Sequence, residues 1–223
     1  MIVVHHLNNS RSQRVLWLLE ELGLEYEVMP YMRDKATMRA PPELRAVHPL
    51  GKSPVITDGE NTIAESGAIV EYLIDGYGKG RLVPAPNTPS RLKYTYWLHF
   101  AEGTAMPPLL MKLIADRIAG AKMPFFARPI ARRLADQIRN GFTGPEIKRQ
   151  LDFMEHELGA SPWFAGEEFT AADIQMSFPL EAAAARGGLD HSRPKLMAWL
   201  DRIHARPAYK RALEKGGKYE LLR

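Results

Sequence analysis

The feature that most constrains the fold is a change of pattern at the proline-rich segment KGRLVPAPNTPSR, residues 79–91. Short apolar segments alternate with helical patterns before it, whereas no strand of any strength is predicted after it. Three prolines within residues 84–89 and little periodicity predict a linker at residues 80–90. The chain is therefore expected to hold a small α/β domain at residues 1–79 and an all-helical domain at residues 91–223.

The predicted elements of the first domain follow the order β-α-β-α-β-β-α. Apolar segments predict strands at residues 2–6 and 26–29, and two more strands in SPVITDGENTIAES that are joined by a hairpin turn at residues 58–61. The spacing of apolar residues predicts helices at residues 12–22 and 66–74, and PPELRAV predicts a helical turn. Five helices are predicted for the second domain, at residues 90–115, 126–140, 145–158, 171–187 and 193–215.

The composition excludes several kinds of chemistry. The chain has no cysteine among its 223 residues, so disulfides, a CxxC redox pair, a cysteine nucleophile and a cysteine-based zinc site are excluded. Any thiol chemistry must therefore be brought in by a ligand. Because the adjacent His5 and His6 would face opposite sides of a strand, and no HExxH spacing occurs, no metal site is expected.

The chain has a net charge of +4 and a pI near 9.3, and much of the excess of basic over acidic residues lies in residues 112–149. A solvated helical face is the first interpretation of this excess, a site for anionic small molecules the second, and nucleic acid the third. Aromatic–basic interleaving of the RNA-binding kind does not occur in the sequence, so we expect no nucleic-acid partner. The N-terminus does not resemble a signal peptide, and no run of about 18 apolar residues occurs, so we expect a cytoplasmic protein without a membrane partner.

A polar cluster separates the first predicted strand from the first predicted helix. Asn9, Ser10 and Ser12 could each cap that helix, and Arg11 and Arg14 lie among them. One capping residue is enough to begin a helix, so this segment holds more polar chemistry than the fold requires.

Two further segments break local rules. Pro54 in KSPVIT cannot donate to a sheet, so it is either a simple strand-start proline or part of a cis Ser53–Pro54 bond that would expose the backbone of Ser53 to a ligand. In AESGAI, Ser66 is predicted as the N-cap of a helix, with Glu65 just before it. Capping alone explains Ser66, but the free N–H groups of a helix start together with Glu65 could also bind an amino-acid head group.

The segment FTAADI is interpreted as a folding motif. Thr170 and Asp173 have the spacing of a capping box, with Asp in place of the usual Glu. Phe169 and Ile174 stand where a hydrophobic staple would lie. We therefore assign this segment to folding and not to catalysis.

Taken together, the strand–helix order, GKSPVI, ESGAI, the proline-rich linker, the helical second half and GEEFTAADI resemble a cytosolic glutathione S-transferase over essentially the whole chain. NNSRSQRVLWLLEELGLEYE resembles the bacterial and fungal branch of that family, near the theta and zeta types. The resemblance implies a thioredoxin-like first domain and a cis Pro54. It also implies a glutathione site at Ser53, Glu65 and Ser66, with Lys52 close enough to contact the glycyl carboxylate.

The resemblance also gives the polar cluster a role, because related enzymes place a hydroxyl or amide there that donates to the glutathione sulfur. Counting back from Arg14, Ser10 falls where the theta-like serine would be, and Asn9 falls where the zeta and tau serine would be. We rank Ser10 first, Asn9 second and Ser12 third, with Arg11 and Arg14 as supporting candidates.

The resemblance implies an enzyme that joins glutathione, as co-substrate, to a hydrophobic electrophile, and it implies a homodimer. Two alternatives stay open. One is glutathione-dependent reduction of disulfides or peroxides, which an Asn9-type site would favour. The other is a non-catalytic interaction module, against which the intact KSP and ESGAI motifs argue.

Overall fold

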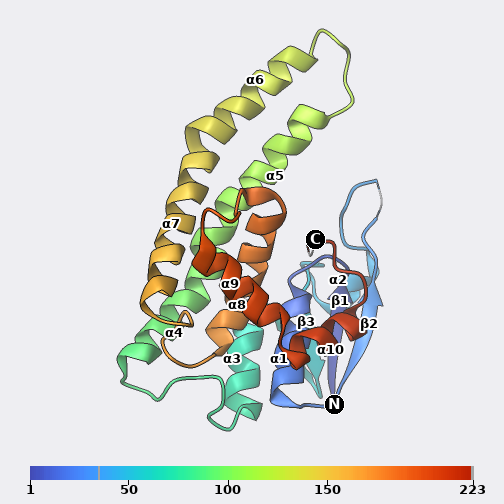
Figure 1. Ribbon diagram of the computed structural model, residues 1–223. Coiled ribbons are helices and arrows are strands. Elements are labelled where there is room, and N and C mark those ends of the chain that lie inside the picture. Colours follow the sequence, from blue (N-terminus) through green and yellow to red (C-terminus); the bar gives the residue numbers. More distant parts are fainter. Residues whose placement is uncertain (35, 222–223) are drawn as a thin grey trace.

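The computed structural model describes residues 1–34 and 36–221. Its first part has the predicted order of elements (Figure 1). These are β1 (Ile2–Leu7), α1 (Ser12–Leu22), β2 (Tyr26–Tyr31), α2 (Glu43–Val47), β3 (Val55–Asp58), β4 (Asn61–Ala64) and α3 (Ser66–Tyr77). No helix or strand occupies residues 78–88, which are all described. The domain boundaries at residues 79, 80–90 and 91 stay a prediction, and residues 222–223 of the predicted second domain lie outside the described part.

The four strands form one mixed sheet in the order β2-β1-β3-β4. β1 pairs with β2 in parallel and with β3 in antiparallel orientation, and β3 and β4 form the predicted hairpin. His5, near the end of β1, pairs with Val55 at the start of β3. Because the two strands run in opposite directions, the loop after β1 and the loop before β3 meet at the same edge of the sheet.

The rest of the chain is helical. Its elements are α4 (Pro89–Phe100), η1 (Ala101–Ala105), α5 (Met106–Gly120), α6 (Arg128–Ile138), η2 (Arg139–Thr143), α7 (Gly144–Ala160), α8 (Ala171–Ala182), η3 (Ala183–Gly187), α9 (Pro194–His204) and α10 (Pro207–Gly216). The fold class predicted from the sequence, a thioredoxin-like α/β part followed by an all-α part, is thus confirmed.

Two connections between helices differ from the prediction, and the helices expected to end at residues 74 and 115 extend to Tyr77 and Gly120. The helices expected at residues 126–140 and 145–158 form one continuous run, because the π-helical turn η2 joins α6 to α7 without a break. The single helix expected at residues 193–215 is instead divided into α9 and α10. Pro207 explains the division, since the residue before a proline is disfavoured in helical conformation, and Arg206 is extended with φ −64° and ψ 132°.

The two parts of the chain share one core. α1 packs against β1 and α3 of the first part, and also against α8 and α10 of the second. Trp17 of α1 is fully buried, with Phe169 and Tyr209 around its ring at centroid distances of 5.6 and 5.0 Å. Burying one aromatic side chain contributes about 1.5–3 kcal/mol, so this contact ties α10 and the loop before α8 to α1.

The predicted capping box at the start of α8 is present. The carboxylate of Asp173 accepts hydrogen bonds from the N–H of Thr170 at 3.0 Å and from its hydroxyl at 3.3 Å. It also accepts from the N–H of Phe164 and the indole N–H of Trp199, both at 3.1 Å. Asp173 is completely buried, and the motif therefore holds the loop before α8, α8 itself and α9 together.

We predict that Asp173→Asn lowers the free energy of unfolding by about 2–4 kcal/mol. The new amide N–H₂ would face donors where the carboxylate accepted hydrogen bonds. Urea titration followed by circular dichroism measures the effect. Asp190→Asn, at an exposed position, is the control and should stay within about 0.5 kcal/mol of the parent; an equal effect of both substitutions would contradict this role of Asp173.

Candidate functional site

A chain of hydroxyl groups lies at the sheet edge where β1 ends and β3 begins. The Oγ of Ser10 is 2.7 Å from the Oγ of Ser12 and 3.3 Å from the Oγ of Ser53. The N–H of Ser12 donates to the Ser10 Oγ at 3.2 Å, and the Ser53 hydroxyl donates to the backbone oxygen of His5 at 3.2 Å. Ser10 is only 4% exposed, so the pairing of β1 with β3 brings three hydroxyls together in a shielded place.

His6 lies next to this chain of hydroxyls. The Nδ1 of its ring is 2.9 Å from the Oγ of Ser12, and the Ser12 hydroxyl also donates to the backbone oxygen of Leu7 at 3.4 Å. Ser12 therefore has partners in His6 and Leu7 besides Ser10. Burial lowers the pKa of His6 below its ordinary value, which favours the neutral imidazole. The hydroxyl proton of Ser10 can be donated to the oxygen of Ser12 or of Ser53, and a charged ligand atom held there would be a stronger acceptor than either.

Asn9 is engaged elsewhere. Its side-chain amide donates to the carboxylate of Glu220 at 3.0 Å and accepts from the backbone N–H of Glu220 at 2.8 Å. The backbone of Asn9 is left-handed, with φ +52°, a conformation that Asn tolerates better than most residues. Both ends of the amide are thus used to bind the C-terminal segment.

The segment before β3 has the predicted cis peptide bond between Ser53 and Pro54. Pro54 is buried at the start of the strand, while Ser53 is partly exposed and Lys52 is exposed. The side chains at positions 52 and 53 therefore lie at the surface beside the hydroxyl chain.

Ser66 is placed differently from the prediction. We expected its hydroxyl to cap the helix, but Ser66 is the first residue of α3, and Glu65 occupies the cap position with φ +72°. The Ser66 Oγ instead accepts from Arg14 Nη2 at 3.0 Å and from Gln175 Nε2 at 3.2 Å. The longer side chains of Arg14 in α1 and Gln175 in α8 thus both donate to this oxygen. The proton of the Ser66 hydroxyl can still be donated to another acceptor.

Arg14 is the centre of a buried polar network. Its side chain is 1% exposed, and its guanidinium donates to the Ser66 hydroxyl, to the backbone oxygen of Gln175 at 2.6 Å and to Glu102 at 2.5 Å. Arg11 adds two bonds to the same carboxylate, each of 2.9 Å. Burial raises the pKa of Glu102, but the charges of Arg14 and Arg11 outweigh it and hold that pKa below its ordinary value.

A cavity of about 350 Å³ opens between the start of α3 and η1. Glu65, Ser66, Glu102 and Gln175 are among the residues that line it. The buried side-chain oxygen of Gln175 has no hydrogen-bond partner among the described residues. The cavity thus combines carboxylates and an unsatisfied acceptor with a hydroxyl and the first N–H groups of a helix, which is a combination suited to a zwitterion.

Two residues of this region were missed by the sequence analysis. Glu102 and Gln175 come from the helical part, 88 and 161 residues from Arg14 along the chain, and no local motif marks either one. Arg14 was named only as a supporting candidate, but its position four residues before Leu18, on the packed side of α1, indicates that it is buried.

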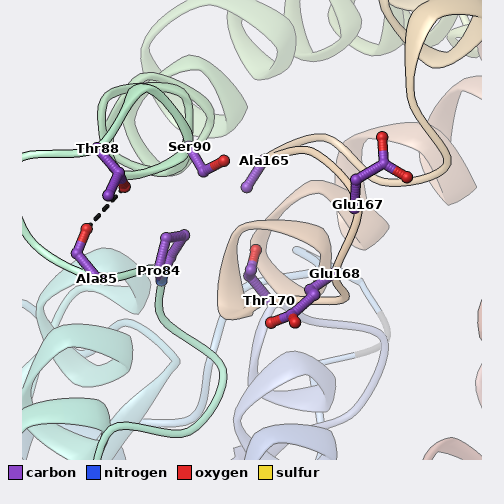
Figure 2. A pocket seen from close by; sticks show the side chains of 8 residues that line it. All are labelled: Pro84, Ala85, Thr88, Ser90, Ala165, Glu167, Glu168 and Thr170. Atoms are coloured by element: carbon purple, nitrogen blue, oxygen red, sulfur yellow. Dashed lines mark hydrogen bonds between the residues drawn. The ribbon is translucent and has the colours of Figure 1, made fainter.

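A second cavity, of about 320 Å³, lies between the linker and the loop before α8 (Figure 2). Its two carboxylates, Glu167 and Glu168, point away from each other, and the Thr88 hydroxyl bonds to the backbone oxygen of Ala85. These groups do not converge on a common point. Among the described residues no group of three His, Cys, Asp or Glu side chains could hold a metal, and no described helix is long and apolar enough to cross a membrane.

A family model described as "Glutathione S-transferase, N-terminal domain" matches residues 1–75, and one described as "Glutathione S-transferase, C-terminal domain" matches residues 135–207. The chain belongs to the glutathione S-transferase family. Similar relatives include glutathione S-transferase 1 of Saccharomyces cerevisiae, 36% identical over 96% of this chain and 95% of that protein, and glutathione S-transferase 3 of Schizosaccharomyces pombe, 38% identical over 96% and 88%.

Solved structures agree. A glutathione S-transferase from Actinobacillus pleuropneumoniae superposes with a TM-score of 0.80 at 34% identity, over 100% of this chain and 96% of that one. A glutathione transferase from Phanerochaete chrysosporium, in complex with oxidised glutathione, gives a TM-score of 0.73 at 27% identity over 96% of each chain. The predicted family and enzyme class are therefore confirmed.

The buried His6 gives a testable pH dependence. Unfolded histidine binds a proton as the pH falls below about 6.5, whereas folded His6 resists it, so stability is present above 6.5 and is lost as the pH falls toward the lower folded pKa. We predict that uptake of this proton lowers the free energy of unfolding by up to about 1.4 kcal/mol per pH unit in that window. Urea titrations at several pH values should show a steeper decline for the parent than for His6→Asn; parallel curves would contradict the prediction.

Proposed function

We propose that the chain is a glutathione transferase that adds the glutathione thiolate to an electrophilic, largely apolar small molecule. The observation that carries this proposal is the convergence of Ser10, Ser12 and Ser53 at the sheet edge, next to the cis Pro54. A thiol held there would meet a shielded hydroxyl donor and the start of α1. Catalysis would come from stabilising the thiolate and from proximity, without a covalent enzyme intermediate.

The cavity beside Ser66 would bind the γ-glutamyl group. The Ser66 proton and the first N–H groups of α3 would donate to its carboxylate, as helix starts do for anions. Its ammonium group would lie near the carboxylates of Glu65 and Glu102, and it would supply the donor that the Gln175 side-chain oxygen lacks. Ser53 would pair with the cysteinyl part through its backbone, and Lys52 would contact the glycyl carboxylate.

Ser10 is the proposed sulfur donor. Its proton has only neutral hydroxyl acceptors in Ser12 and Ser53, and a thiolate is a stronger, charged acceptor. A thiol of pKa near 8.5 is only a few per cent ionised at pH 7, and lowering its pKa by two units needs about 2.7 kcal/mol. One charge-assisted hydrogen bond together with a helix start is of this size.

Asn9 and Ser12 are less suited to that role. Both ends of the Asn9 amide bind Glu220, so donating to sulfur would cost those contacts. Ser12 is completely buried and is hydrogen-bonded to His6 and to the backbone oxygen of Leu7. This difference supports conjugation over disulfide reduction, because an Asn9-type site would favour the reductase hypothesis.

We predict that Ser10→Ala lowers kcat/KM for conjugation of a model aryl halide at least about tenfold, because the thiolate loses its donor. The ultraviolet absorbance of enzyme-bound thiolate, followed against pH, should show a higher thiol pKa in this variant. Asn9→Ala is the matched comparison and should change both quantities less. An unaffected Ser10→Ala with an inactive Asn9→Ala would overturn the ranking.

Calorimetric titration with reduced and with oxidised glutathione tests the proposed function as a whole. We predict tighter binding of the reduced form and about a tenfold loss of affinity in Ser66→Ala. Ser90→Ala, outside the proposed site, is the control. Comparable or tighter binding of oxidised glutathione would favour disulfide reduction. If neither form binds at millimolar concentration, the non-catalytic interaction module is the remaining hypothesis.

A homodimer and a cytoplasmic location are also part of the proposal. Leu92 and Tyr96 on α4 are 75% and 48% exposed, and α4 also contributes His99 to the cavity beside Ser66. Such exposed apolar side chains next to a proposed site are suited to contact with a second copy. That copy would then border the γ-glutamyl cavity.

A further inference from the structure

The hairpin formed by α5 and α6 projects from the body of the molecule (Figure 1). Phe125 and Phe126, in the turn between the two helices, are 80% and 68% exposed, and their ring centroids lie 5.7 Å apart. Two adjacent phenylalanines so exposed leave a large apolar area in contact with water. Isolated exposed apolar residues are common, but a contiguous group indicates a contact surface.

The same apolar surface continues along α6. Ile130 and Leu134, one turn apart, are 64% and 53% exposed, and Ala135 is the one residue of α6 that is buried. α6 is strongly amphipathic, and the part of its apolar side that Ile130 and Leu134 form is not covered by the described part of this chain. We call Phe125, Phe126, Ile130 and Leu134 the hairpin tip.

α5 presents apolar side chains on the same face. At 100° per residue, Ile114 and Ile118 lie on one side of the buried Ala115, whereas Lys112 and Asp116 lie on the other. Asp116 bonds to Arg139, which is the first residue of η2 and lies on the corresponding side of the helical run that continues from α6. The ion pairs thus occupy one face of the hairpin, and the exposed isoleucines occupy the face that Ile130 and Leu134 share.

Positive charge surrounds the hairpin tip. Between Asp116 and Asp136 the sequence contains no acidic residue over residues 117–135. It contains five basic residues there, namely Arg117, Lys122, Arg128, Arg132 and Arg133. All five are exposed. An apolar wedge with basic side chains around it combines the two features by which amphipathic helices bind anionic bilayers.

We propose that the hairpin tip binds the surface of a membrane that contains anionic lipids. Phe125 and Phe126 enter the boundary between headgroups and acyl chains, and the neighbouring basic side chains contact the headgroup phosphates. The charge favours this occupant over a second copy of the chain, because two copies joined tip to tip would bring two clusters of five cations together. The expectation of no membrane partner rested on the lack of a spanning segment, which does not bear on binding to a surface.

Vesicle flotation of the full chain tests the proposal. Vesicles of phosphatidylglycerol mixed with phosphatidylcholine are compared with vesicles of phosphatidylcholine alone, at low and at high salt. We expect binding to the anionic vesicles that weakens as salt rises. The double variant Phe125→Ser, Phe126→Ser and the double variant Arg132→Glu, Arg133→Glu should each lower the vesicle-bound fraction at least about tenfold.

Matched controls separate this site from general effects. Phe142→Ser removes a phenylalanine that is 54% exposed but lies outside the tip. Lys148→Glu with Arg149→Glu reverses two exposed charges on α7. Both controls should bind vesicles like the parent, and light scattering should give all variants the mass of the parent.

Three results would overturn the proposal. The first is no binding of the parent to anionic vesicles at low salt, and the second is an equal loss of the vesicle-bound fraction in the control variants. The third is a change of mass in the phenylalanine variant, which would assign the hairpin tip to contact with a second copy. Because the hairpin tip shares no residue with the glutathione site, the tip variants should keep the parent's activity toward a soluble aryl halide. The membrane proposal can therefore fail while the transferase proposal stands, and the reverse.

Discussion

The buried guanidinium of Arg14 is the interaction on which the rest of the structure depends. A charge that is 1% exposed needs partners, and those of Arg14 come from three separate elements: Ser66 at the start of α3, Glu102 in η1 and the backbone of Gln175 in α8. Its two Nη atoms donate to these groups, whereas its Nε has no partner among the described residues. Removing one partner of a buried ion pair typically costs about 3–5 kcal/mol, since the other charge is left uncompensated. Arg14 therefore joins η1 and α8 of the helical part to α1 and α3 at the proposed glutathione site.

One helix thereby sets both ends of that site. The residues before α1 bring Ser10 and Ser12 against Ser53, where the sulfur would lie, while Arg14 holds the Ser66 hydroxyl, where the γ-glutamyl group would lie. Because Ser10 and Arg14 are only four residues apart, the distance between the two subsites is fixed by little more than one helical turn. A shift of α1 would move both, and most residues of α1 are buried, so packing against its neighbours holds it in place.

Local patterns predicted the order of the elements, and the resemblance implied the cis bond at Pro54. The hydrogen-bond network around Arg14, in contrast, could not be predicted from local patterns. Glu102 lies in a π-helical turn with no distinctive motif, and its pairing with Arg14 spans 88 residues. Ser66 was expected as a cap because serine before a helix usually caps it, and here two donors from distant helices took its oxygen instead. Such pairings depend on how helices meet, which periodicity does not specify.

The contrast between α1 and α6 follows from the same limit. Both are amphipathic, and apolar spacing predicts a helix for each. α1 has neighbours on almost every side, so even an arginine is buried and needs a carboxylate within reach. α6 lies at the end of a projecting hairpin, where nothing in the described chain covers Ile130 and Leu134. An amphipathic pattern therefore states only that a helix has an apolar face, and its surroundings decide whether that face becomes core or a surface for binding.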